Sequence, residues 1–153
     1  MPDYIKWIRS KIGNEMAIFV FANACIINEK NEILLQRRKE ENAWGLPGGA
    51  LELGESAEEA LHREIKEETG LEITIEKLLG VYTKYFHIYP NGDKTQTIVM
   101  TFVCHPTGGE LQRENEETLE LAYIAPENMP PLIFDDNRDA IQDYINGNFG
   151  VVR

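Results

Sequence analysis

The segment between Ser56 and Gly70 constrains the fold of this chain most, because it predicts a helix with clearly marked ends. Ser56 is followed three residues later by Glu59, which is the pattern of an N-terminal capping box. Gly70 is typical of the residue that ends a helix. The fold must therefore provide a surface against which the apolar face of this helix can pack.

The apolar face of this helix carries two glutamates. On a helical wheel with about 100° per residue, the apolar arc is made by Ala57, Ala60, Leu61 and Ile65. Glu64 and Glu68 lie in the middle of this arc, and Glu67 lies at its edge. The residues that point away from the arc, as expected of a solvated face, are Glu58, Glu59, His62 and Lys66.

Carboxylates on a buried face need a positive partner, because an unpaired buried charge is costly. Arg63 projects from another side of the helix and cannot cover both Glu64 and Glu68. A divalent cation bound by oxygen ligands is the simplest partner for the two. The preceding loop supports this interpretation, since residues 46–49 (LPGG) leave backbone groups free to approach an ion or a phosphate. Taken alone, the loop would be explained by a tight turn.

The spacing of these residues resembles a known signature. Counting from Gly49, the chain reads Gly, five residues, Glu55, seven residues, and then REIKEETGL over residues 63–71. This resembles the complete signature of the Nudix hydrolases, GX5EX7REUXEEXGU with U an aliphatic residue, and residues 49–71 match it at every fixed position. The order of the flanking segments is also similar to that of the family, from residue 17 to about residue 145.

The resemblance implies one Nudix hydrolase domain over residues 1–153, with residues 1–13 as an accessory N-terminal helix. The fold class is α/β, a Nudix-type α/β/α sandwich around a mixed β-sheet, and the order of helical and strand patterns agrees with it. The predicted helices cover residues 3–12, 56–69 and 136–146. The predicted strands cover residues 17–28, 32–38, 71–89 (in several runs), 95–105 and 117–125, with a turn at 107–109. The last helix is expected to turn Ala140, Ile141, Tyr144 and Ile145 inward.

A metal site follows from the resemblance. Glu64 and Glu68 match the principal metal ligands of the family, with Glu67 as a further ligand or a carboxylate that positions water. Gly48 matches the position whose backbone carbonyl completes the site. The implied cofactor is Mg²⁺ or Mn²⁺, which would neutralise the diphosphate and lower the pKa of a bound water.

The catalytic roles beyond the metal are less uniform within the family. Arg63 matches the arginine that orients a glutamate of the signature, and Glu55 is its expected partner. The general base is either a glutamate of the signature, such as Glu64 or Glu67, or one on a later loop. Among the later candidates Glu114, Glu116 and Glu117, the last is favoured because ETLELAY resembles the downstream family pattern.

The implied reaction is hydrolysis of the pyrophosphate linkage in a nucleoside diphosphate joined to a moiety X, giving a nucleoside monophosphate and phosphorylated X. The substrate is left open between a nucleotide sugar, an ADP-ribose-like compound, a dinucleoside polyphosphate and a nucleoside triphosphate, which could be oxidised. The alternative is a Nudix-fold module that binds a nucleotide without cleaving it, which the complete signature disfavours. A diphosphate isomerase of the same fold would need a catalytic cysteine, whereas Cys25 and Cys104 lie within predicted strands.

Substrate contacts are the least constrained part of the prediction. Arg37 and Arg38 end a predicted strand and could hold phosphate oxygens, although solvated arginines would explain them equally well. Aromatic residues that could stack on a base are Phe19, Tyr82, Tyr85, Phe86 and Tyr89. Strand alternation places Tyr85 on one face with Val81, Thr83, His87 and Tyr89. Which face meets the ligand is left open, and Tyr85 is the residue we expect to bind substrate.

The net charge of −11 disfavours polynucleotides and anionic membranes as partners, and leaves a small-molecule nucleotide reached through cations. From Glu52 to Glu76 the chain carries nine glutamates, so the acid is concentrated around the signature. No stretch approaches the roughly 18 apolar residues of a membrane span. The isolated cysteines are expected to be buried free thiols, and without a secretory signal the expected location is the cytoplasm. The sequence is also compatible with a homodimer.

Overall fold

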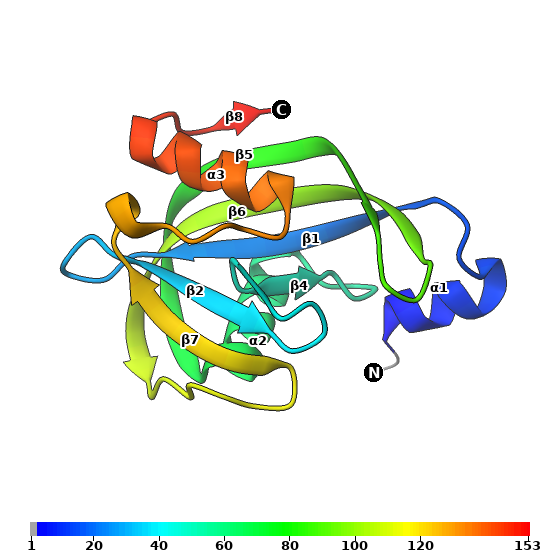
Figure 1. Ribbon diagram of the computed structural model, residues 1–153, viewed down its shortest axis with the longest axis horizontal. Coiled ribbons are helices and arrows are strands. Elements are labelled where there is room, and N and C mark those ends of the chain that lie inside the picture. Colours follow the sequence, from blue (N-terminus) through cyan, green and yellow to red (C-terminus); the bar gives the residue numbers. More distant parts are fainter. Residues whose placement is uncertain (1–2) are drawn as a thin grey trace.

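The computed structural model describes residues 3–153 and contains two sheets, three α-helices and a short 3-10 helix (Figure 1). The helices are α1 (Tyr4–Ile12), α2 (Ala57–Thr69), η1 (Pro126–Asn128) and α3 (Asp135–Asn146). The strands are β1 (Ala17–Ile26), β2 (Ile33–Arg38), β3 (Ala43–Gly45), β4 (Gly48–Ala50), β5 (Leu71–Ile88), β6 (Lys94–Gly109), β7 (Thr118–Ile124) and β8 (Val151–Val152).

The larger sheet is mixed, as the sequence predicts. Its strand order is β4-β1-β6-β5-β8, with β1 parallel to β6, β8 parallel to β5, and the remaining pairs antiparallel. A second, antiparallel sheet has the order β3-β2-β7. In Figure 1, α3 lies over β5 and β6 on one side of the larger sheet, while α2 lies behind β2, β4 and β7.

Two apolar clusters hold the layers together. The first joins α3 to the larger sheet through Ala140, Ile141, Tyr82, Val99 and their neighbours. The second joins α2 to the other face of that sheet through Leu61, Ile65, Ala22, Ala24 and Ile26. The smaller sheet contributes Ile33 and Leu35 to the first cluster, and Leu34 and Leu121 to the second. The result is the expected α/β/α sandwich.

Local sequence signals place the helix ends accurately. Ser56 Oγ accepts a hydrogen bond from the backbone N–H of Glu59, and the Glu59 carboxylate accepts one from the backbone N–H of Ser56. Gly70 ends α2 in the left-handed conformation, with φ 78°. Asp3 accepts a hydrogen bond from the N–H of Lys6 at the start of α1. These contacts fix where the helices begin and end, while the packing of Leu61 and Ile65 in the second cluster turns one face of α2 toward the sheet.

Two sequence predictions about local structure are wrong, those for residues 107–109 and for Ile145. The expected turn at residues 107–109 is absent, because β6 continues through Gly109 and pairs with Leu71 of β5. The strand runs predicted over residues 71–89 are confirmed and form one long strand, β5, whose register shifts between Tyr82 and Tyr85 and at three earlier points. Ile145 of α3 is exposed rather than inward.

Two further observations concern the whole described chain. Cys25 and Cys104 are buried free thiols, as expected. None of the helices formed within residues 3–153 has both the length and the apolar character needed to cross a membrane.

Candidate active site

The carboxylate face of α2 lies against β4, where two glycines permit a very close approach. Glu68 is buried, and its Oε2 accepts a hydrogen bond from the backbone N–H of Gly48 at 2.9 Å. A Cβ at Gly48 would collide with the Ala22 carbonyl oxygen, and one at Gly49 would collide with the Glu64 carboxylate. The glycines at these two positions therefore allow the acidic face of the helix to meet the backbone of β4.

Glu68 lacks a positive partner. It retains 4% of its surface, and no lysine or arginine within residues 3–153 forms an ion pair with it. Burial, followed by the neighbouring charge of Glu64, raises the pKa of Glu68 to about 8. Burial likewise raises the pKa of Glu64, although Arg63 opposes the shift. Glu68 is thus a buried carboxylate that forms no ion pair in the described chain, and the charge of Arg38 only partly opposes the rise in its pKa.

Arg63 joins the other carboxylates of the signature. Its Nε and Nη2 donate to the two oxygens of Glu55 at 2.7 and 2.9 Å, so the expected pair is present. Its Nη1 donates to Glu64 at 2.9 Å and lies 3.5 Å from Glu67. Hydrogen bonding from Arg63 lowers the pKa of Glu55. Arg63 therefore fixes Glu64 and the start of the helix but does not reach Glu68, as the wheel predicts.

Glu117 reaches the same cleft from a different part of the chain. It lies just before β7, in a segment that Asn115 fastens to α2 by donating from Nδ2 to the backbone carbonyl of Glu68 at 2.7 Å. The charge of Glu117 contributes to the raised pKa of both Glu64 and Glu68. Neither Glu114 nor Glu116 lines the cleft.

These groups line a cleft of about 450 Å³, together with Arg38. Burial lowers the pKa of Arg38, but Glu68, Glu41 and Glu117 raise it by more, so the guanidinium stays charged beside the carboxylates. Its Nε donates to Glu41 at 3.2 Å. Arg37 points elsewhere, toward Glu120 and Asn42, and does not line the cleft. The two arginines that are adjacent in the sequence are therefore separated by the structure.

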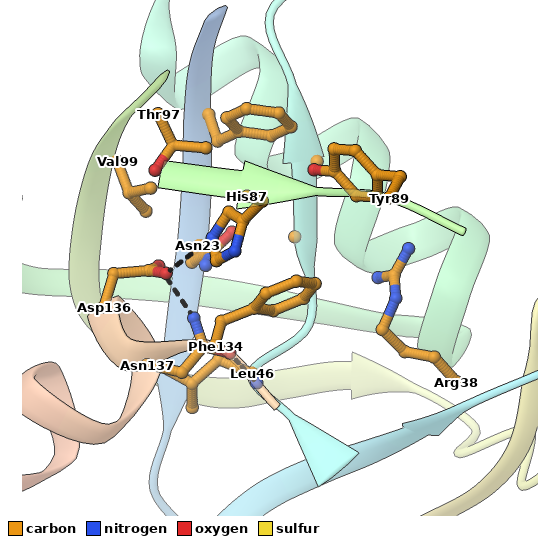
Figure 2. Close-up of a pocket in the computed structure, with 13 residues that line it drawn as sticks. Asn23, Arg38, Leu46, His87, Tyr89, Thr97, Val99, Phe134, Asp136 and Asn137 are labelled. Atoms are coloured by element: carbon orange, nitrogen blue, oxygen red, sulfur yellow. Dashed lines mark hydrogen bonds and ion pairs between the residues drawn. The ribbon is translucent and has the colours of Figure 1, made fainter. Parts of the chain in front are cut away.

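A smaller cavity of about 90 Å³ opens beside this cleft and shares Phe21, Arg38, Gly48, Gly49 and Tyr89 with it. Figure 2 shows His87 and Phe134 facing each other inside the cavity, with Tyr89 and Arg38 toward one end. The rings of His87 and Phe134 are edge to face, with centroids 4.5 Å apart. This wall is suited to a flat aromatic group.

Buried polar groups face this smaller cavity. Asp136 is 4% exposed, accepts a hydrogen bond from Asn137 Nδ2 at 2.9 Å, and lies 3.5 Å from His87 Nε2 (Figure 2). Asn137 is fixed in turn, because its Oδ1 accepts the backbone N–H of Leu46. Thr97 Oγ1 is buried without a hydrogen-bond partner. The cavity thus combines an aromatic wall with a rigid acceptor.

Tyr85 lies outside both cavities, so the prediction that it binds substrate is not supported. The pairing is regular from Tyr85 onward, so Tyr85 does share a face with His87 as predicted, but α3 covers it. The Tyr85 hydroxyl donates instead to Asp139 of α3 at 2.6 Å, and its ring packs against Tyr82. His87 and Tyr89, further along the strand, do line the smaller cavity.

Sequence reasoning missed most residues of the smaller cavity. Asn23 lies within an apolar strand pattern, and Phe134, Asp136 and Asn137 look like the polar start of a surface helix. A buried acid in the first turn of a helix gives no signal in one sequence, because its burial depends on the sheet packed above it.

The residues present fit a divalent cation, although they are not already arranged around one. No group of three or more histidine, cysteine, aspartate or glutamate side chains in residues 3–153 surrounds a common point. Glu64 is held by Arg63 and Glu68 by the Gly48 N–H, which accounts for this. A buried carboxylate without a positive partner, beside a second one, is nevertheless the donor set that a hard cation requires.

Comparisons with known proteins agree with the fold and the signature. Residues 19–144 match the family model described as the NUDIX domain. The chain is 39% identical over 129 residues to an ADP-ribose pyrophosphatase of Methanocaldococcus jannaschii, covering 82% of this chain and 72% of the relative. It is 36% identical over 122 residues to a putative 8-oxo-dGTP diphosphatase of Bacillus subtilis, covering 80% and 76%. The crystal structure of a UDP-X diphosphatase matches with a TM-score of 0.69 at 26% identity, covering 97% of this chain and 73% of that one.

Proposed function

Because the chain belongs to the NUDIX family and is a hydrolase of acid anhydrides, we propose that it cleaves the pyrophosphate linkage of a nucleoside diphosphate joined to a moiety X. The observation that carries the proposal is the line formed by two adjoining cavities, the smaller one (the aromatic cavity) and the carboxylate-lined cleft, which share Phe21, Arg38, Gly48, Gly49 and Tyr89. It leads from the aromatic cavity at His87 and Phe134, past Arg38, to the carboxylates of Glu64 and Glu68. A nucleotide has the same order of parts, with a flat base, a sugar and then phosphates.

Mg²⁺ or Mn²⁺ would be held by Glu64, Glu68 and Glu67, with the backbone carbonyl of Gly48 as a further oxygen ligand. Glu68 supports this assignment most strongly, because it is buried, forms no ion pair in the described chain, and has a raised pKa despite the charge of Arg38. When bound, the cation supplies charge neutralisation for the diphosphate and acidifies a water molecule.

The side chains of the cleft account for the other steps. The guanidinium of Arg38 binds and orients phosphate oxygens, and Arg63 holds Glu64 and Glu55 in place. Glu117 accepts a proton from the attacking water. The water oxygen forms a bond to phosphorus while the bridging P–O bond breaks. The products are a nucleoside monophosphate and phosphorylated X. If Glu117 is not the base, Glu64 or Glu67 takes that role.

The aromatic cavity is the proposed site of the base. Phe134 and His87 offer surfaces for a ring, and Asp136 offers a carboxylate that accepts hydrogen bonds from ring N–H or amino groups. The names of the similar proteins include two purine nucleotides, ADP-ribose and 8-oxo-dGTP, and one pyrimidine nucleotide, UDP-X, so the proposal covers both kinds of base.

The other candidate function is a module that binds a nucleotide without cleaving it. The experiment that separates the two is a screen of nucleoside diphosphate derivatives and oxidised nucleoside triphosphates with Mg²⁺ or Mn²⁺, with products identified by mass. We expect nucleoside monophosphate from at least one compound and no product after exhaustive chelation. Binding without any product would favour the module, and turnover that survives chelation would refute the metal site.

A further inference from the structure

Helix α1 lies outside the residues that match the family model, yet it forms one wall of the carboxylate cleft. The matched region begins at residue 19, whereas Asp3, Ile5 and Arg9 of the N-terminal segment line the cleft with Glu64 and Glu68. In Figure 1, α1 lies beside the turn that joins β5 to β6. The cleft therefore has an end built from elements that the catalytic signature does not explain.

Two attachments fix α1 in this position. At its start, the backbone N–H of Tyr4 donates to Glu52 at 2.8 Å, just before the signature glutamate Glu55. Toward its end, Arg9 donates from Nη2 to the Lys94 carbonyl at 2.6 Å and to Thr95 Oγ1 at 3.1 Å. The wall is thus tied both to the loop that precedes α2 and to β6.

The guanidinium of Arg9 has little capacity left for a ligand. Its Nη1 donates to the carbonyls of Gly13 and Glu15, in addition to the two contacts made by Nη2. The side chain is 10% exposed and lies over the ring of Phe19. Its Nε, buried without a hydrogen-bond partner, is 3.7 Å from Asp93. The terminal N–H groups, which would bind a phosphate, already donate to three backbone carbonyls and to the Thr95 hydroxyl.

The rest of this end of the cleft is acidic and apolar. Asp3, Glu52 and Asp93 line it, along with Ile5 and the aromatic Phe19. Of the other two arginines that line the cleft, Arg63 is already paired with three glutamates, and Arg38 lies beside the aromatic cavity. Additional phosphates would meet carboxylates here, with no free cationic side chain among the described lining residues.

We propose that the α1 end of the cleft holds the moiety X, and that X is an uncharged polyhydroxylated group such as a sugar. This inference rests on the proposed function, which places the base in the aromatic cavity and the diphosphate between Arg38 and the carboxylates. X then extends toward α1, because the cleft continues in that direction. Hydroxyl groups can donate to Asp3, Asp93 and Asn91, and the ring face of a sugar can pack against Ile5.

The same wall disfavours a nucleoside triphosphate or a dinucleoside polyphosphate as substrate. Both would place further phosphate charge next to Asp3, Glu52 and Asp93. The repulsion acts across a partly desolvated cleft, where charges are screened less than in bulk water. The chain should therefore discriminate between substrates by the group attached to the second phosphate.

The test compares kcat/KM for a nucleoside diphosphate sugar and for the triphosphate of the same nucleoside, such as ADP-ribose with ATP and UDP-glucose with UTP, all with Mg²⁺. The wild-type chain should favour the diphosphate sugar by about tenfold or more. A preference for the triphosphate in every pair would overturn the inference while leaving the proposed function intact. Failure to cleave any of these compounds or any other anhydride would end both.

Charge variants of the wall give a second, more specific test. Ile5→Arg adds a cation at a position of α1 that lines the cleft. The ratio of kcat/KM for the diphosphate sugar to kcat/KM for the triphosphate should fall by about tenfold. Ser10→Arg is the matched control, because it adds the same charge to an exposed position of α1 that does not line the cleft. Its ratio should equal that of the wild type.

Asn91→Lys tests the same wall from the exposed turn between β5 and β6, without altering the packing of α1. Asn91→Lys provides a separate result if Ile5→Arg lowers the melting temperature of the protein. Both variants should shift the ratio in the same direction. If folded Ile5→Arg and Asn91→Lys both leave the ratio equal to that of Ser10→Arg, the wall does not contact X and the inference is wrong.

Discussion

Glu68 on α2 and Asp136 on α3 are equally buried, but their surroundings are opposite. Each retains 4% of its surface. Asp136 accepts a hydrogen bond from Asn137 and lies beside His87, and Asn137 is itself fixed by the backbone of Leu46. Glu68 accepts a single backbone N–H, from Gly48, and its nearest carboxylate neighbours raise its pKa further.

The difference between Glu68 and Asp136 shows that burial alone does not tell what a buried acid does. Asp136 is a preformed acceptor, because its side-chain partners hold it in one orientation without any ligand. Glu68 is costly to ionise in the metal-free chain and becomes favourable only when positive charge arrives from outside. We therefore assign cation binding to the α2 region and recognition of the base to the α3 region.

The largest effect should follow from Glu68→Gln. The amide keeps the shape of the side chain but removes the charge that binds the cation, so kcat should fall by about 1,000-fold or more. The melting temperature should not fall, since no ion pair is lost. Steady-state kinetics and thermal unfolding of Glu58→Gln, an exposed position on the same helix, provide the control. Similar kinetics in both variants would refute the division of α2 into functional and solvated faces.

The next largest effect is expected from Glu117→Gln. If Glu117 is the base, kcat should fall by about 100- to 1,000-fold with little change in KM, since the proton is transferred only in the transition state. Glu114→Gln and Glu116→Gln should be nearly silent, because neither residue lines the cleft. Full activity of Glu117→Gln would return the role of base to Glu64 or Glu67.

Arg63→Ala should act indirectly. Loss of its bonds to Glu55 and Glu64 would let both carboxylates move, and kcat/KM should fall by tenfold to several hundredfold, which is about 1.4 to 3.5 kcal/mol. Arg63→Lys should recover part of the loss, because it restores the charge but not the two parallel hydrogen bonds to Glu55. An Arg63→Ala enzyme with unchanged kinetics would show that the network does not position the site.

The smallest effect should come from Asp136→Asn. It exchanges an acceptor for a donor at one carboxylate position facing the base, so KM should rise by about tenfold while kcat changes little. Kinetics with a purine and a pyrimidine substrate would locate the effect, because only a contact with the base depends on which base is present. A fall in kcat with no change in KM would contradict the assigned separation of the two regions.

The sequence predicts the α2 region well because its signals are local. A capping box, a terminal glycine and the spacing of Glu64 and Glu68 on one helix face depend on residues within a few turns of each other. The same locality explains why the predicted pairing of Arg63 with Glu55 is confirmed. The mixed sheet and the sandwich also follow from the order of helical and strand patterns.

The α3 region could not be predicted because its site depends on tertiary packing. Tyr85 shares a face with His87 as strand alternation predicts, but it donates to Asp139 of α3, and the position of α3 over this strand depends on tertiary packing. Asp136 becomes buried only when His87 and Leu46 lie over the start of α3. Likewise, the sequence predicts α1 only as an accessory helix, and its place beside the cleft depends on the attachment of Arg9 to β6.

The most direct test of the comparison is calorimetric titration of Mn²⁺ into the wild-type chain, Glu68→Gln and Asp136→Asn, at neutral pH and without substrate. We predict saturable binding to the wild type, affinity lower by about 10- to 100-fold in Glu68→Gln, and wild-type affinity in Asp136→Asn. Equal affinity of the wild type and Glu68→Gln would contradict the claim that the unpartnered carboxylate of α2 binds the cation.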